Sequence, residues 1–164
     1  MKLVYSIVLS LVSCLTFAED VLITGTVQSK CIINTDTAGI YGNPTSDKLS
    51  TAAADGGVMP IIRYDVSLAD AYTAKVTTPT SFSTSPNLTD TVTWTGSTTV
   101  SSVSDTAMSD YDTNAVEYDA TTEFDLHTAG TVWLKVDSTA EYGYNKAFPG
   151  GIYRAIVEAE CIAN

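Results

Sequence analysis

Apolar and polar side chains alternate with a period of two along most of the chain. The clearest examples run over Pro60–Leu68 and Ala71–Thr78, where every second residue is apolar or aromatic and the residues between are polar. This alternation is typical of β-strands that bury one face and expose the other. Because no amphipathic stretch with helical spacing exceeds about two turns, the pattern predicts a chain built almost entirely from strands.

Further strands are predicted where the same alternation returns after turn residues. They cover Val21–Ile33, Thr91–Thr95, Thr98–Val103, Thr122–Thr128, Thr131–Ser138 and Gly151–Ala163. About eight strands with turn signals at short intervals predict an antiparallel β-sandwich.

The connections between these strands are predicted from their turn chemistry. Ala69-Asp70 leaves only two residues between two strands, which suits a hairpin. Gly-, Asn- and Pro-rich turns surround Lys48–Ala54, a segment that could form at most a short helix. The acidic stretch Asp105–Asp119 is expected to be irregular.

The N-terminus has the pattern of a secretory signal peptide. Lys2 precedes the apolar run Leu3–Leu15, and Thr16-Phe17-Ala18 forms a small-residue cleavage site. The run is shorter than the roughly 20 residues of a membrane-spanning helix. We therefore expect residues 1–18 to be removed and residues 19–164 to form a single domain without a transmembrane segment. An alternative is lipidation of Cys14, because Leu11-Val12-Ser13-Cys14 resembles the lipobox of bacterial lipoproteins.

The charge of the chain restricts its partners. Without the leader, seven basic residues face nineteen acidic ones, a net charge of −12. Nucleic acid and anionic membrane surfaces are polyanions that such a protein repels. The sequence thus predicts no nucleic-acid partner.

The cysteines predict one structural bridge. Removal of the leader leaves Cys31 and Cys161, which an oxidising compartment would join as a disulfide. There is no Cys-x-x-Cys pair, and His127 is the only histidine. The sequence also lacks the Gly-x-Ser-x-Gly and His-Glu-x-x-His motifs of hydrolases. We therefore expect neither an enzyme nor a resident cofactor.

The order of these strands resembles that of fimbrial-subunit and spore-coat-like secreted proteins of bacteria. The resemblance spans most of residues 19–164. It rests on Ile23-Thr24-Gly25-Thr26-Val27 before Cys31, Tyr72-Thr73-Ala74-Lys75-Val76-Thr77-Thr78-Pro79, Ala129-Gly130-Thr131-Val132-Trp133-Leu134 and Pro149-Gly150-Gly151-Ile152-Tyr153. It implies an immunoglobulin-like (pilin-like) sandwich that passes through the bacterial periplasm to the cell surface. It also implies a structural or adhesive role, association with further copies or other assembly subunits, and help from a periplasmic chaperone and an usher.

In that family an N-terminal extension of one subunit completes the incomplete sandwich of the next. The residues implied in assembly here are Val21, Ile23 and Val27 near the N-terminus, and Gly151, Tyr153 and Val157 in the last strand. Only Glu19-Asp20 precede the first predicted strand, so three alternatives stay open. Val21–Val27 doubles as the donor, the subunit assembles by another route, or it does not assemble. A bridge between Cys31 and Cys161 would pin the two edges that a donor must separate, unless it lies at their ends.

A monomeric extracellular binding module is the competing interpretation. Asp110, Asp112 and Asn114 could contribute oxygen ligands to a loose calcium site, although the spacing excludes an EF-hand. Trp94, Trp133 and the tyrosines could instead form a glycan-binding platform, but alternating aromatics more often pack in a core. A third interpretation is an envelope or virion sandwich protein that packs laterally.

Overall fold

The computed structural model describes residues 22–25 and 30–164. The predictions for the signal peptide 1–18, for cleavage after Ala18 and for Cys14 lie outside these residues, as do Val21 and Val27.

The described part of the chain is all-β and antiparallel, as predicted. Twelve strands and two short 3-10 turns form it, and no α-helix occurs among the described residues. The strands are β1 (Cys31–Thr37), β2 (Gly42–Thr45), β3 (Lys48–Ser50), β4 (Ile61–Val66), β5 (Tyr72–Thr77), β6 (Phe82–Thr84), β7 (Val92–Val103), β8 (Val116–Tyr118), β9 (Thr121–Asp125), β10 (Gly130–Tyr142), β11 (Arg154–Ala155) and β12 (Glu158–Ala163). The turns are η1 (Ala53–Asp55) and η2 (Thr106–Met108).

The largest sheet is organised around β10. Along one edge, the first half of β10 pairs with β4 and its last residues pair with β3, while β7 pairs along the other edge. Strand β1 continues the sheet beyond β4, and β2 continues it beyond β3. One long strand thus holds together two groups of short ones.

A second sheet has the order β12-β5-β9-β8, and β6 and β11 form a small two-stranded sheet. One buried cluster joins the two larger sheets. Its members from β4 and β10 are Ile62, Tyr64, Val66, Val132, Leu134 and Val136, and those from β5 and β9 with the adjoining Leu126 are Ala74, Val76, Phe124 and Leu126. The apolar side of each alternating strand therefore packs into a shared core.

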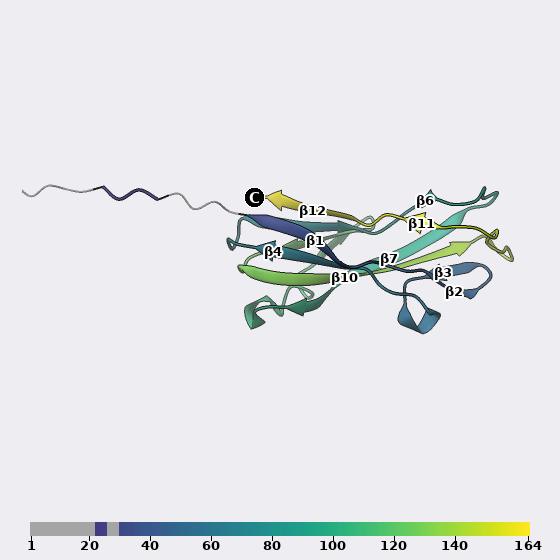
Figure 1. Ribbon diagram of the computed structural model, residues 1–164, viewed down its shortest axis with the longest axis horizontal. Coiled ribbons are helices and arrows are strands. Elements are labelled where there is room, and N and C mark those ends of the chain that lie inside the picture. Colours follow the sequence, from purple (N-terminus) through teal and green to yellow (C-terminus); the bar gives the residue numbers. More distant parts are fainter. Residues whose placement is uncertain (1–21, 26–29) are drawn as a thin grey trace, which may run out of the picture.

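The edge strand β1 of the largest sheet lies next to the edge strand β12 of the second sheet, as Figure 1 shows. Cys31, the first residue of β1, forms a disulfide with Cys161 near the end of β12, with 6.4 Å between their Cα atoms. This confirms the predicted bridge. It lies at the ends of both strands, so the remaining length of each edge is free of it.

The first predicted strand, Val21–Ile33, was wrong in its bounds. β1 begins only at Cys31 and continues to Thr37. Residues 22–25 are not part of a strand, and the side chains of Leu22 and Ile23 are 86% and 91% exposed. Among the described residues, no strand pairs with residues 22–25.

The predicted hairpin through Ala69-Asp70 was also wrong. β4 pairs with β1 and β10, whereas β5 pairs with β12 and β9 in the other sheet. The connection crosses between the sheets, and Asp70 takes the left-handed conformation with φ 58°. Both strands thereby direct their apolar faces into the same core from opposite sides.

Other segments are more regular than predicted. Lys48–Ala54 contains β3 and the first two residues of the short 3-10 helix η1. The two strands predicted on either side of Gly96 are one strand, β7. At Gly96 the backbone approaches Thr78 so closely that a Cβ atom would lie 2.8 Å from the side chain of Thr78. The segment Asp105–Asp119 includes η2 and β8.

Loss of the disulfide is expected to destabilise the fold strongly. The bridge joins residues 130 positions apart, so it restricts the unfolded chain over nearly its whole length. We predict that the double variant Cys31→Ser/Cys161→Ser loses about 2–5 kcal/mol of unfolding free energy in urea titrations. An unchanged unfolding free energy would show that the bridge does not constrain the fold.

Candidate functional site

An open groove of about 910 Å³ separates the edges of β1 and β12 beyond the disulfide. One wall comes from β1, β3, β4 and the 38–41 connection, and includes Ile33, Ile40, Leu49 and Ile62. The other wall is the segment 151–159 with β11 and the start of β12. The groove therefore lies where the two sheets are not joined to each other.

Both walls contain strand edges without a partner. Among the described residues, β1 pairs only with β4 and β12 only with β5. The backbone groups on the other side of each strand are thus available to a further strand. Exposed apolar side chains border the opening: Ile40 is 58% exposed and Ile156 is 62% exposed.

An aromatic cluster holds the end of the groove opposite the disulfide. The ring of Phe82 in β6 makes edge contacts with Trp94, Phe148 and Tyr153, with centroids 4.7, 6.0 and 5.1 Å apart. The Tyr153 hydroxyl donates to the carbonyl oxygen of Pro149 at 2.6 Å. Trp94 thus packs against other rings, as the core interpretation of the aromatics predicts, and this packing fixes β11 as a wall of the groove.

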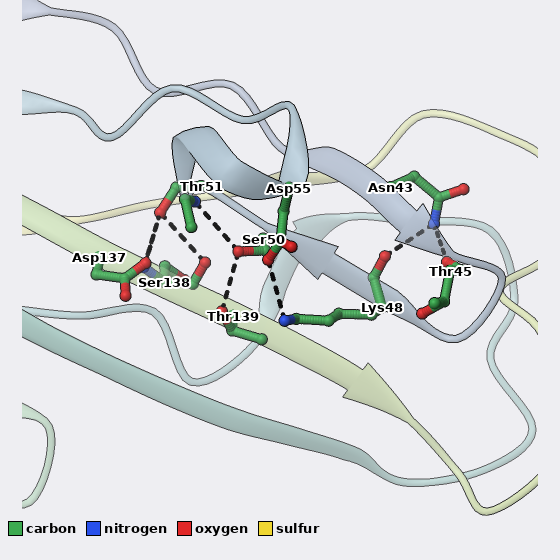
Figure 2. A network of polar contacts seen from close by, with 10 residues as sticks. Asn43, Thr45, Lys48, Ser50, Thr51, Asp55, Asp137, Ser138 and Thr139 are labelled. Carbon is green, nitrogen blue, oxygen red and sulfur yellow. Dashed lines mark hydrogen bonds and ion pairs between the residues drawn. The ribbon is translucent and has the colours of Figure 1, made fainter.

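A polar network fixes the opposite wall on β10 (Figure 2). The Thr51 hydroxyl accepts from the backbone N–H of Ser138 at 2.8 Å and donates to Asp137 at 3.1 Å. The Thr51 N–H donates to the carbonyl oxygen of Ser138 at 2.9 Å. Because Thr51 and Ser138 are buried, their polar groups cannot hydrogen-bond to water, and each of these bonds gives such a group a partner. The network therefore positions the β3 wall.

Two further contacts complete this wall. The Tyr41 hydroxyl and the Ser138 hydroxyl lie 2.9 Å apart, and burial raises the pKa of the Tyr41 phenol although this hydrogen bond opposes the shift. The raised pKa keeps the Tyr41 phenol neutral at ordinary pH, where it serves as a hydrogen-bonding group. The second contact is an ion pair between Lys48 and Asp55 at 3.0 Å, which connects β3 to η1.

The structure brings the C-terminal residues implied in assembly to this groove. Gly151, Tyr153 and Val157 all line it. Ile23 lies outside the folded body and is almost fully exposed. Sequence reasoning missed Ile40, which lies in a turn-rich segment, and Leu49, which lies in the segment expected to form at most a short helix. It also missed Arg154, which looked like an ordinary polar position of the last strand. The interruption between β11 and β12 gave no local signal.

The candidate calcium residues have different hydrogen-bond partners in the structure. Asp110 accepts from the side-chain amide of Asn114 at 2.9 Å and lies 3.5 Å from the ring Nε2 of His127. Asp112 instead accepts from the backbone N–H of Val100 at 3.4 Å. Over residues 22–25 and 30–164, no three His, Cys, Asp or Glu side chains are grouped to hold a metal ion.

His127 belongs to a separate polar hollow of about 420 Å³. Its ring lies edge-on to Tyr111, with centroids 4.6 Å apart, and Tyr111 hydrogen-bonds Thr128 through its hydroxyl. The side chain of His127 is exposed. These contacts anchor the 105–119 segment on the core and bring no nucleophile to the histidine.

Comparisons with known proteins give no relative: no family model, no curated protein and no solved structure matches the chain. In the part of the chain that the structure describes, no helix has the length and hydropathy to cross a membrane.

Two buried threonines are expected to respond oppositely to the same substitution. Thr51→Val removes the acceptor for the Ser138 N–H and should cost about 1–3 kcal/mol of unfolding free energy. The Thr98 hydroxyl is buried without a hydrogen-bond partner in the described structure, so Thr98→Val should be neutral or stabilising by about 1 kcal/mol. Denaturant titrations compare the two, and equal losses would contradict the network described above.

The ion pair between Lys48 and Asp55 predicts that the stability of the fold depends on pH. The Lys48 ammonium, followed by the Ser50 hydroxyl, lowers the pKa of the Asp55 carboxyl. Since the folded pKa is below the unfolded one, the stability from this group is present above the unfolded pKa and is lost as pH falls through the folded pKa. In carboxyl NMR titrations, Lys48→Met should raise the Asp55 pKa, whereas Lys146→Met at an exposed site should not. An Asp55 pKa indifferent to Lys48→Met would contradict the assignment.

Proposed function

We propose that the protein is an exported, non-catalytic structural or adhesive subunit of a bacterial surface or fimbria-like assembly. In this proposal the groove between β1 and β12 receives an extended segment from another copy of the chain. The observation that supports it is a groove with a largely apolar lining, each wall of which contains a strand edge without a partner among the described residues.

The walls have the chemistry that strand addition requires. An incoming strand is held by backbone hydrogen bonds to an open edge, and its alternate side chains enter apolar pockets. Ile33 and Ile62 on one side and Val157 and Ala159 on the other offer such an apolar lining. None of the lining residues is Asp, Glu, His or Cys, so the groove offers no carboxylate, imidazole or thiol for catalysis.

The segment before Lys30 is the proposed donor. Val21, Ile23, Gly25 and Val27 occupy every second position, which places them on one side of an extended strand. The side chain of Ile23 is 91% exposed, which is unfavourable for a large apolar group unless a partner covers it. If the leader is removed after Ala18, residues 19–30 reach about 40 Å when extended.

The disulfide is compatible with this arrangement because it joins the edges only at their ends. We infer an immunoglobulin-like (pilin-like) sandwich with one incomplete side, supported by two antiparallel sheets that share one core. The oxidising compartment that the bridge requires agrees with export through the periplasm, where a chaperone could protect the open groove before an usher directs assembly.

The donor is tested by two neighbouring residues that face opposite ways in a strand. Ile23→Asp places a carboxylate among the groove pockets and should turn oligomers of the exported chain into monomers. Leu22→Asp introduces the same charge on the other side of the strand and should leave most oligomers intact. Sedimentation velocity of both variants measures the difference.

If the chain without substitutions is monomeric in sedimentation velocity, the proposal is rejected. Equal effects of Ile23→Asp and Leu22→Asp would reject strand insertion as the mode of association, because only an inserted strand distinguishes adjacent residues.

A further inference from the structure

Arg154 provides one positive charge in a groove whose lining is otherwise uncharged. It is the only charged residue among those that line the groove, although the chain has nineteen acidic residues against eight basic ones. Its side chain is exposed, and in the described structure it has no ion-pair partner. The groove is thus an acid-free surface with one unpaired cation.

The proposed donor has the complementary distribution of charge. Between residues 19 and 29 the only charged side chains are Glu19 and Asp20, both at the N-terminal end. A carboxylate placed against the apolar part of the groove would lose its hydration without a partner. At Arg154 it gains a charge-assisted hydrogen bond to a guanidinium.

We propose that Arg154 binds the acidic end of the segment donated by a second copy and thereby sets the direction of the inserted strand. This inference rests on the proposed function and goes one step beyond it. Arg154 lies in β11, at the end of the groove away from the disulfide (Figure 1). The donated strand then runs with Glu19-Asp20 at β11 and with its Lys30 end at the Cys31 end of the acceptor.

This direction also defines how the two copies meet. The N-terminal segment leaves the body at the Cys31 end, and residues 22–25 lie away from the body (Figure 1). Two copies whose Cys31 ends face each other can each donate to the other, which gives a closed pair with two-fold symmetry. An open head-to-tail chain requires the opposite direction of insertion, with Glu19-Asp20 near Lys30 of the acceptor.

Charge reversal tests the contact in the exported chain that begins at Glu19. Arg154→Glu should weaken association about tenfold or more, as should Glu19→Lys/Asp20→Lys, and combining the three changes should restore most of the affinity. Arg154→Lys should stay within about threefold, because it keeps the cation. Lys146→Glu changes the net charge equally at an exposed site outside the groove and should have little effect.

Carbodiimide coupling then reads the direction. In Arg154→Lys mixed with its isotope-labelled copy, peptide mapping should show residue 154 of one copy joined to residue 19 or 20 of another. Coupling of residue 19 or 20 to Lys30 of another copy, or to residue 154 of the same copy, would overturn the inference. So would the absence of rescue in the triple variant.

These outcomes are distinct from failure of the proposed function. If oligomers form and respond to Ile23→Asp but the coupling or rescue result is contrary, strand donation stands and the role of Arg154 falls. If the unchanged chain forms no oligomers, both fall.

Discussion

The disulfide between Cys31 and Cys161 is the constraint on which the rest of the structure depends. It joins the outermost strands of two sheets that share one core, and it does so at only one end of those strands. Beyond the bridge, β1 and β12 belong to different sheets and do not pair with each other. Their facing edges therefore border a groove lined largely by apolar side chains. A single covalent contact therefore closes the fold at one end and leaves it open at the other.

Different interactions outside the groove stabilise its two walls. Buried hydrogen bonds from Thr51 to β10 fix the β3 side, whereas ring contacts around Phe82 fix the β11 side. Neither set of contacts needs an occupant in the groove. A preformed site of this kind loses little conformational entropy when a strand binds, which favours association. Under the proposed function, the apolar alternation of the N-terminal segment matches the apolar lining and the open edges of the groove.

The sequence predicted the features that follow from local patterns. Alternation located β4, β5, β9 and β10, and the two cysteines predicted the bridge. It could not predict that β4 and β5 enter different sheets, because alternation shows which residues are buried and not which strand lies beside which. It also could not reveal that Ile40, Leu49 and Arg154 meet in one groove, since they come from three distant segments. The strand predicted at Ile23 does not form in the described structure, and under the proposed function the partner of this segment lies in another copy.

Amide hydrogen exchange, compared between the assembled and the dissociated chain 19–164, tests most directly whether a strand fills the groove. Backbone groups that gain hydrogen bonds exchange more slowly. If a donated strand fills the groove, protection appears on assembly in β1 and in residues 154–159, while β8 at the far edge of the second sheet is unchanged. Unchanged exchange along both groove edges, or new protection confined to β8, would contradict it.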